Sequence, residues 1–235
     1  GKVFRLNLTT QRWEIVFQAN QTHGWNNAYS LVEYRGYLIT AFNRFPHNDQ
    51  TLIVYYNGTT WGSFQFGPFN HARFVVYRGE LVACGLSAPI VEGGHSQCLR
   101  WNGSQFVELF HLNNGLHTSK PYVWRDRLYL AVEGSPAGIW RWDGQRVEEV
   151  YAIPPGTLNI EQFTEHNSVL YGVSIARWRA TEGNGKLFAS RDGATWQDIY
   201  HFPEPEAWAI LSHHGVLYVG TRREGGGGKV YRLNP

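Results

Sequence analysis

The stretch Trp140-Arg141-Trp142-Asp143-Gly144 reveals the repeat from which the fold can be worked out. It is an apolar strand that closes on Asp-Gly, a dipeptide favoured by tight β-hairpin turns. Five other segments share the pattern of an apolar stretch that ends on Asn or Asp, and the six turn residues follow one another at intervals of 41 to 50 residues. The six segments are residues 4–7, 54–57, 99–102, 140–143, 189–192 and 231–234.

A second kind of hairpin lies between these segments. Its second strand carries an apolar pair and is preceded by a tight turn, as with Leu38-Ile39 after Tyr34-Arg35-Gly36. A further short strand follows five of the Asn or Asp turns, at residues 12–17, 60–66, 105–110, 146–151 and 195–200. Each unit of about 45 residues therefore contains four short strands, A to D, and such a repeat is typical of a β-propeller.

We therefore predict an all-β fold, a five-bladed β-propeller with four antiparallel strands per blade, formed by residues 1–235 as a single domain. The blades are expected at about residues 28–66, 71–110, 118–151, 159–200 and 206–235, the last together with residues 1–17. The last unit lacks a D strand, so the N-terminal strand is expected to close the ring by pairing with it. The C strand of this blade is present in two near-identical copies, Gly-Lys-Val-Phe-Arg-Leu-Asn at residues 1–7 and Gly-Lys-Val-Tyr-Arg-Leu-Asn at residues 228–234. One copy is expected to form the blade strand and the other to be displaced, paired at an edge or swapped in a dimer.

The pattern resembles bacterial and lectin-type propellers with "Leu-Tyr-x-Gly … Tyr-Arg-x-Asp/Asn-Gly-x-x-Trp" repeats over essentially the whole chain. Ser190-Arg191-Asp192-Gly193-Ala194-Thr195-Trp196 is similar to the Asp-box of sialidase-type propellers, shortened by one residue. In that family the box is a structural turn away from the active site, so the resemblance implies a fold and no sialidase activity. Five-bladed lectins of the tachylectin type share the blade number, but their repeat signature differs.

Composition excludes several classes of protein. Apolar residues make up 43% and charged residues 17% of the chain, which suits a folded core and not a disordered segment. No apolar run approaches the 18 or so residues that a membrane span needs. The net charge of +2 does not suit a protein held to nucleic acid mainly by phosphate contacts.

The two cysteines leave two alternatives open. Cys84 and Cys98 can form one bridge, or they can be buried thiols in a reducing compartment. The chain contains no Met, which suggests a processed product or an excerpt of a longer protein. A secreted or cell-surface location is favoured.

The expected strand directions place the tight A–B and C–D turns on one face and the longer B–C and D–A connections on the other. Binding residues tend to lie on long loops held by a rigid scaffold. The long-loop face is rich in His, Arg and aromatic residues, whose rings stack on flat ligand faces and whose guanidinium groups pair with anions. The candidate ligand-binding residues on its loops are Trp25, Arg44, Arg177, Trp178 and Arg179.

Six positions before the last residue of each A–B turn, a column of Ser30, Arg73, Lys120, Glu161 and Ala209 is expected at the polar entrance of an axial funnel. Arg73, Lys120 and Glu161 complete the set of candidate ligand-binding residues, with Glu161 orienting the cations around an anionic group. The alternative is a salt-bridged channel plug. No close-spaced His or Cys pattern supports a metal site, and no cofactor is expected.

Three functions remain open. The favoured one is a non-enzymatic, lectin-like module that binds a carbohydrate or another small polar or anionic ligand. The second is a glycan-active hydrolase or lyase, with Glu161 and Glu206, or His71 and His117, as acid and base. The third is a protein-interaction scaffold cut from a longer chain.

Overall fold

The computed structural model describes residues 1–19, 25–44, 50–67, 69–87, 95–112, 117–133, 137–176 and 182–233. The side chains of Asn26, Asn27, Arg44 and His117 lie outside this description. The chain divides into two compact units, Gly1–Leu112 and Asn113–Pro235, and each is described by itself.

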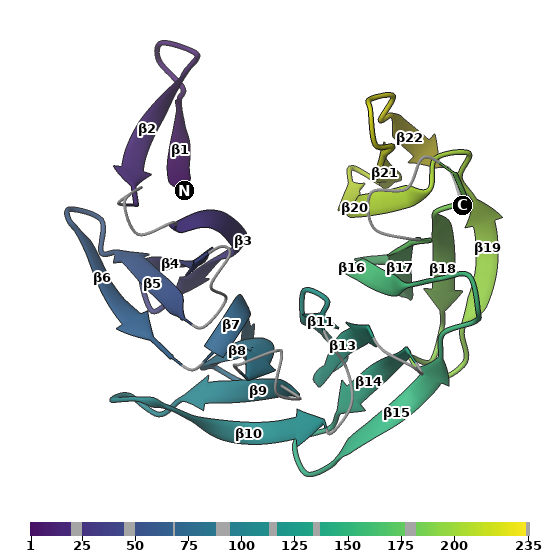
Figure 1. The fold of residues 1–235 in the computed structure, drawn as a ribbon, viewed down its shortest axis with the longest axis horizontal. Coiled ribbons are helices and arrows are strands. Elements are labelled where there is room, and N and C mark those ends of the chain that lie inside the picture. Colours follow the sequence, from purple (N-terminus) through teal and green to yellow (C-terminus); the bar gives the residue numbers. More distant parts are fainter. Residues whose placement is uncertain are drawn as a thin grey trace. The chain divides into compact units, whose positions relative to one another are not determined.

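The first unit contains a two-stranded hairpin and two four-stranded antiparallel sheets (Figure 1). The hairpin consists of β1 (Lys2–Asn7) and β2 (Arg12–Gln18). The first sheet has the order β3 (Trp25–Tyr34), β4 (Tyr37–Arg44), β5 (Thr51–Tyr56) and β6 (Trp61–Phe66). The second has the order β7 (Phe69–Tyr77), β8 (Glu80–Ser87), β9 (Ser96–Trp101) and β10 (Phe106–Leu112).

The second unit continues the same antiparallel pattern. β11 (His117–Thr118) and β12 (Tyr122–Trp124) both pair with β13 (Arg127–Glu133), which is followed by β14 (Gly138–Trp142) and β15 (Val147–Ala152). Next come β16 (Asn159–His166), β17 (Val169–Ile175), β18 (Lys186–Ser190) and β19 (Gln197–His201). The last strands are β20 (Glu206–His213), β21 (Val216–Arg222) and β22 (Val230–Leu233), joined to the preceding sheet by one pair, Ile175 and Glu206. Among the described residues there is no helix that is long and apolar enough to cross a membrane.

The A–B hairpins turn through two residues that both have positive φ. Arg35 and Gly36 have φ of 50° and 80°, between the paired residues Tyr34 and Tyr37. Turns of this kind match the right-handed twist of the two strands that they join. The other four turns are Arg78-Gly79, Arg125-Asp126, Asn167-Ser168 and His214-Gly215. The five tight A–B hairpins expected from the sequence are thus present.

The C–D turns are held by the Asn or Asp side chain that ends each C strand. The Asn57 Oδ1 accepts hydrogen bonds from the backbone N–H groups of Thr59 and Thr60, at 2.9 and 2.8 Å. Asn and Asp are favoured at such positions because their short side chains can replace a backbone acceptor. The same two bonds form at Asn7, Asn102, Asp143 and Asp192. This side-chain contact explains why the repeat marks its turns with these residue types.

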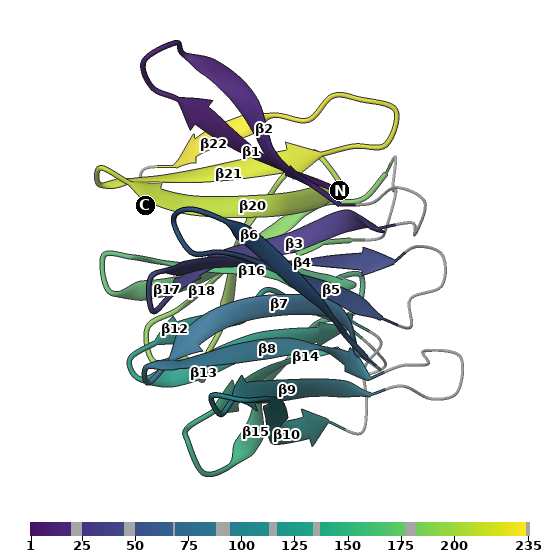
Figure 2. The ribbon, with the colours of Figure 1, turned by 90° about the vertical axis from the view of Figure 1, so that its left-hand side faces the viewer.

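Neighbouring sheets within each unit pack face to face. In the first unit, Ile39 and Ile53 of one sheet share a buried cluster with Phe74 and Leu81 of the next. Figure 2 shows these two sheets edge-on, one above the other. In the second unit the equivalent clusters contain large rings, among them Trp124, Tyr129, Phe163, Phe188 and Trp196. Burial of an aliphatic or Phe side chain contributes about 1.5–3 kcal/mol, so these interfaces hold the sheets together.

Cys84 and Cys98 form a disulfide. The two residues lie directly opposite each other on the adjacent strands β8 and β9. The sequence alone leaves open whether these cysteines form a bridge or remain two thiols. Pairing of the two strands places their Cα atoms 4.1 Å apart, where a bridge can form. The bridge links β8 covalently to β9 in the second sheet, close to the long connection between these strands.

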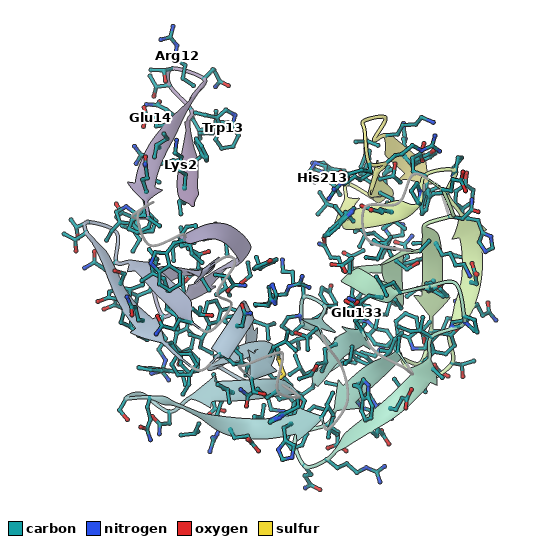
Figure 3. All side chains as sticks on the ribbon, viewed as in Figure 1. Lys2, Arg12, Trp13, Glu14, Glu133 and His213 are labelled. Carbon is teal, nitrogen blue, oxygen red and sulfur yellow. A yellow bond between two sulfur atoms is a disulfide. The ribbon has the colours of Figure 1, made fainter. Side chains whose placement is uncertain are left out.

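Both copies of the duplicated terminal sequence form strands. β1 pairs with β2, and β22 pairs with β21 as the third strand of the last sheet. The β1–β2 hairpin is two-faced: Phe4 and Trp13 are 52% and 68% exposed on its apolar face, while Arg5 and Glu14 form an ion pair on the other. Figure 3 shows Trp13 and Glu14 on opposite sides of the hairpin.

Candidate functional site

The strands β3, β7, β16 and β20, which each form the first strand of an A–B hairpin, contain an inserted residue relative to their partner strands. In β7, Asn70 pairs with Leu86 and Arg73 with Cys84, so that two residues of β7 oppose Gly85 alone. This is a β-bulge, which bends a strand and re-aims a side chain. Bulges of the same kind interrupt β3, β16 and β20, and residues 119–121 separate β11 from β12 at the corresponding place.

The interruption occupies an equivalent position in all five first strands. Five residues before the last residue of each strand stand Tyr29, Ala72, Ser119, Glu161 and Trp208. These positions lie in the half of each strand that is reached from the preceding long connection. Bulges are over-represented next to binding and active sites, because they turn side chains out of the regular alternation.

The structure places Glu161 one position outside the column of residues that is expected six positions before the A–B turns. In the hairpin of β16 and β17, His166 pairs with Val169, so both Asn167 and Ser168 are turn residues. The equivalent of Gly36 is therefore Ser168, and the residue aligned with Ser30, Arg73, Lys120 and Ala209 is Gln162. Glu161 is instead the inserted residue of the bulge.

In the first unit, the two bulges bring together Tyr29, His71 and Arg73. The Tyr29 and His71 rings meet edge to face with their centroids 5.0 Å apart. The Arg73 guanidinium carbon lies 5.2 Å from the centroid of the same Tyr29 ring, within the range of a cation–π contact. We name these three residues the imidazole cluster.

The backbone of β7 is shaped to hold this cluster. His71 has a φ of 56°, a conformation that costs a non-glycine residue free energy and that tends to occur at functional sites. Its N–H donates to the Asn70 Oδ1 at 2.7 Å. A Cβ at Gly85 would come within 2.4 Å of the Asn70 carbonyl oxygen, so only glycine fits opposite the bulge. A hydrogen bond of 2.9 Å from the Phe74 N–H to the Ser30 Oγ ties β7 to β3.

Burial is the main cause that lowers the pKa of the His71 imidazole to about 4, and the nearby charge of Arg73 lowers it further. The imidazole is therefore neutral near pH 7. In that form one ring nitrogen donates and the other accepts a hydrogen bond.

In the second unit, the bulge of β16 carries Glu161, which is only 4% exposed. Its carboxylate accepts a hydrogen bond of 3.1 Å from the Asn159 Nδ2. The Lys120 N–H donates to the Glu161 backbone oxygen at 3.4 Å, which brings the interrupted strand of the preceding sheet against β16. Lys120 and Glu161 are thus joined through their backbones.

Glu206 is the first residue of β20 and is fully buried. The Trp208 Nε1 donates to its Oε2 at 2.7 Å, and the Arg222 Nε lies 3.5 Å from the same oxygen. The Arg222 guanidinium carbon lies 5.7 Å from the centroid of the Trp208 ring. Ile175 pairs with Asn159 on one side and with Glu206 on the other, and Asn159 donates the hydrogen bond to Glu161. We name Lys120, Glu161, Glu206, Trp208 and Arg222 the carboxylate cluster.

The remaining candidates are not part of these clusters as described. Trp25 is 4% exposed and packs in a core with Phe42 and Val54, so its ring is a structural element of the first sheet. Arg44 ends β4 and His117 begins β11, and their side chains are outside the description. Arg177, Trp178 and Arg179 lie outside the described residues.

Sequence reasoning missed the two rings that accompany the charged groups. Tyr29 and Trp208 are inserted residues of bulges, and a bulge leaves no mark in the alternation of apolar and polar residues. Each sits beside an Arg, since Arg73 contacts Tyr29 and Arg222 contacts Trp208. The clusters therefore share a ring, a guanidinium group and a buried acid or imidazole.

Chemically, these groups suit a ligand with both hydroxyl and anionic groups. Buried carboxylates accept hydrogen bonds from hydroxyl groups, guanidinium groups donate to carboxylates and phosphates, and rings cover apolar faces. Among the described residues, no group of three or more His, Cys, Asp or Glu side chains is arranged to hold a metal ion.

Comparison with known proteins identifies the fold but no family. No family model matches the chain, and no curated protein matches its sequence. A Dyadobacter fermentans protein of unknown function has a similar structure, with 15% identity and a TM-score of 0.60 over 90% of this chain and 80% of that one. The α-L-arabinofuranosidase of Fusarium graminearum, solved with an iminosugar inhibitor, has 11% identity and a TM-score of 0.60 over 90% of this chain and 79% of that one. The β-propeller domain of the trilobed protease of Pyrococcus furiosus has 11% identity and a TM-score of 0.58 over 99% of this chain and 73% of that one.

These neighbours agree with the sheets described above. The chain has a β-propeller fold, all-β in its described residues and constructed from antiparallel sheets of four strands. At 11–15% identity the similarity concerns the fold and assigns no activity.

Proposed function

We propose that the protein is a five-bladed β-propeller that binds a carbohydrate, or another small polar or anionic ligand, on its long-loop face. The observation that carries the proposal is the interruption of all five first strands at one equivalent position. A bulge repeated in these strands, with different inserted residues, suits a scaffold that presents side chains to a ligand.

The composition of the clusters supports a ligand rich in hydroxyl groups. The Tyr29 and Trp208 rings are half-buried, so each keeps a face or edge for contact. Glu161 and Glu206 are buried carboxylates that accept hydrogen bonds from Asn159 and Trp208. Carboxylate oxygens beside aromatic rings suit a ligand rich in hydroxyl groups.

A glycan array followed by calorimetric titration tests the proposal. The glycan selected by the array should bind the Arg73→Gln variant about tenfold more weakly, because Arg73 stands in the imidazole cluster. Arg146→Gln is the matched control, because Arg146 is 73% exposed beside a C–D turn, and its affinity should be unchanged. An array without binders, or equal losses in the two variants, would rule the proposal out.

A glycan-active enzyme is the second candidate, because Glu161 and Glu206 are buried carboxylates on adjacent first strands, and Ile175 pairs with both Glu206 and Asn159, the hydrogen-bond donor to Glu161. Glycoside hydrolysis uses two carboxyl groups on either side of the scissile bond. Turnover of aryl glycosides that falls about a hundredfold or more in both Glu161→Gln and Glu206→Gln would support hydrolysis. Wild-type turnover that is absent, or that is unchanged in both variants, removes this candidate. His71 and His117 are the alternative acid–base pair for such an enzyme, a hydrolase or a lyase.

We propose that the ring closes through the β1–β2 hairpin. β22 ends the last sheet, and β2 is antiparallel to β1, which carries nearly the same sequence as the β22 segment. A sheet in the order β20-β21-β22-β2-β1 would give the last blade its fourth strand and cover Phe4 and Trp13. Closure within one chain and exchange of the hairpin in a dimer use the same contacts.

Mass photometry with a matched pair of variants tests this closure. Trp13→Arg should lower the thermal stability of the monomer, or dissociate the dimer, because it places a charge in the closing contact. Glu14→Gln, on the opposite face of β2, should do neither. Equal behaviour of the two variants and the wild type would contradict the closure.

The Cys84–Cys98 bridge supports a secreted or cell-surface location, because disulfides persist in oxidising compartments. No nucleic-acid partner is proposed. A protein-interaction scaffold remains an alternative if the hairpin exchanges between chains.

A further inference from the structure

The first unit contains a cavity of about 510 Å³ between its two four-stranded sheets, at the end of the strands opposite the long connections. Its lining begins at the Tyr34–Tyr37 turn and reaches Gly103 in the β9–β10 turn. The volume lies in the range of 300–1,000 Å³ that is usual for small-molecule sites. The described residues that line it are Tyr34, Arg35, Tyr37, Ile39, Ile53, Tyr55, Phe64, Leu81, Trp101, Gly103 and Phe106.

A continuous row of aromatic rings forms the wall. The centroids of Tyr37 and Tyr55 are 6.1 Å apart, those of Tyr55 and Phe64 are 6.5 Å apart, and those of Phe64 and Trp101 are 6.4 Å apart. Gly62 makes this row fit, since a Cβ there would come within 2.3 Å of the Tyr55 Cζ. Tyr37 and Phe64 are 42% and 39% exposed, so the row presents ring surface to solvent.

The second unit provides an internal comparison, because its groove between the sheets of β13 and β17 is filled. Strand pairing aligns Trp124, Tyr129 and Trp196 with Tyr34, Ile39 and Phe106. These three larger rings are 1–6% exposed and belong to one buried cluster. A Cβ on Gly193, in the facing turn, would come within 2.0 Å of the Tyr129 hydroxyl oxygen. The first unit therefore has smaller side chains where the second has a packed core.

The arginine of the turn also differs between the two grooves. Arg125 crosses the filled groove and donates to the backbone oxygens of Arg191 and Ser168, at 3.0 and 3.1 Å. Arg35, at the equivalent position, lies over the Tyr34 ring at 5.1 Å, and within the described part of the chain it makes no hydrogen bond or ion pair. It is the one charged residue among the described residues that line the cavity. The open groove thus offers rings and one unneutralised cation.

We infer that this cavity binds a small molecule with a planar aromatic body and a single anionic group, such as an aryl carboxylate. The rings of the row would contact the planar body edge to face or offset, as aromatic pairs prefer. The Arg35 guanidinium would pair with the anionic group, for which its planar fork is suited. The site lies at the opposite strand ends from the imidazole cluster, so it does not depend on the proposed carbohydrate site.

Calorimetric titration with 2-naphthoate, and with the neutral 2-naphthamide, tests the inference. The wild type should bind naphthoate at least tenfold more tightly than naphthamide. Arg35→Gln should remove this difference, whereas Arg78→Gln, in the same turn of the next sheet, should leave it unchanged. Ile39→Tyr introduces the tyrosine ring that fills the other groove at the equivalent position, Tyr129. This variant should bind neither compound. Thermal unfolding verifies that each variant is folded.

The inference is overturned if the wild type binds neither compound, or if Arg35→Gln and Arg78→Gln give the same affinities. Binding that survives in a folded Ile39→Tyr variant would place the ligand elsewhere and overturn it too. If Ile39→Tyr does not fold, the comparison of the two arginine variants decides.

Discussion

The Tyr29 ring meets the His71 imidazole edge to face, with 5.0 Å between their centroids. The two residues come from the first strands of neighbouring sheets, and each lies at a bulge. Each bulge therefore turns a side chain toward the other sheet, where the contact forms. Arg73 shares the same Tyr29 ring, so the contact also positions the charge that we assign to ligand binding.

His71 should make folding stability depend on pH. The pKa of its imidazole falls from an ordinary value of 6.5 to about 4 in the folded protein, first through burial and then through Arg73. Between these values the unfolded chain binds a proton that the folded state does not, so stability is full above pH 6.5 and is lost as the pH falls through 4. The loss from this group is about 3 kcal/mol at most. Urea unfolding at pH 4 to 7 measures it.

His71→Asn is the matched variant, because Asn tolerates a positive φ. Its stability should change much less between pH 6.5 and 4. If the variant and the wild type lose stability in parallel over this window, the assigned role of His71 is wrong.

Gly85→Ala should disrupt the bulge of β7. The added Cβ would lie 2.4 Å from the Asn70 backbone oxygen, and backbone cannot move aside as a flexible side chain can. We expect a loss of about 1–3 kcal/mol in the free energy of unfolding, together with weaker glycan binding. Gly220→Ala is the control, since its Cβ would meet the Ala209 Cβ at an ordinary 3.6 Å. Equal unfolding free energies for the two variants would count against the close contact.

Glu204 should anchor the last strand of the second unit. It is 2% exposed, accepts a hydrogen bond of 2.7 Å from the Tyr231 hydroxyl and lies 2.8 Å from the Lys229 Nζ. Burial alone would raise the pKa of this carboxyl group, but the hydrogen bonds from Lys229 and Tyr231 outweigh it and hold the pKa at about 2. Its contribution is therefore present above pH 4.5 and lost as the pH falls toward 2.

Glu204→Gln should lower the free energy of unfolding by about 1.5–3 kcal/mol at pH 7, because a buried charge-assisted contact is lost. Hydrogen exchange of the β22 amides should rise as well. Glu224→Gln breaks an exposed pair with Arg222 and should change neither quantity. Protected β22 amides in Glu204→Gln would show that another contact anchors this strand.

Reduction of the disulfide should destabilise the first unit. Cys84 and Cys98 are 14 residues apart in sequence, and a loop of about 15 residues corresponds to about 3 kcal/mol in the chain-entropy model. Thermal unfolding with and without reductant measures this difference. Alkylation of the unfolded, unreduced protein should add no label to either cysteine, and labelling of both would mean that the bridge is absent.

The sequence predicts the hairpins and turns well because each is decided locally. Asn57 and its counterparts hold their own turns, and two-residue turns such as Arg35-Gly36 follow from the residues that adopt positive φ. The bulges are not predictable in this way, because an inserted residue shows only when two strands are paired. That is why Tyr29 and Trp208 are missed. Glu161 is misplaced by one position because the turn after β16 ends at Ser168 and not at Asn167.

Trp25 shows a second limit of sequence reasoning. A Trp in a long connection favours a ligand contact, but β3 extends to Trp25 and buries its ring against Phe42. The status of the two cysteines also depended on strand pairing, because Cys84 and Cys98 become neighbours only through the register of β8 and β9.

A crystal structure of the protein soaked with the glycan that the array selects tests the proposed binding site most directly. Ligand density should appear at the bulged first strands, in contact with Arg73 or Glu161. Density confined to another part of the surface, with both of these side chains untouched, would contradict it.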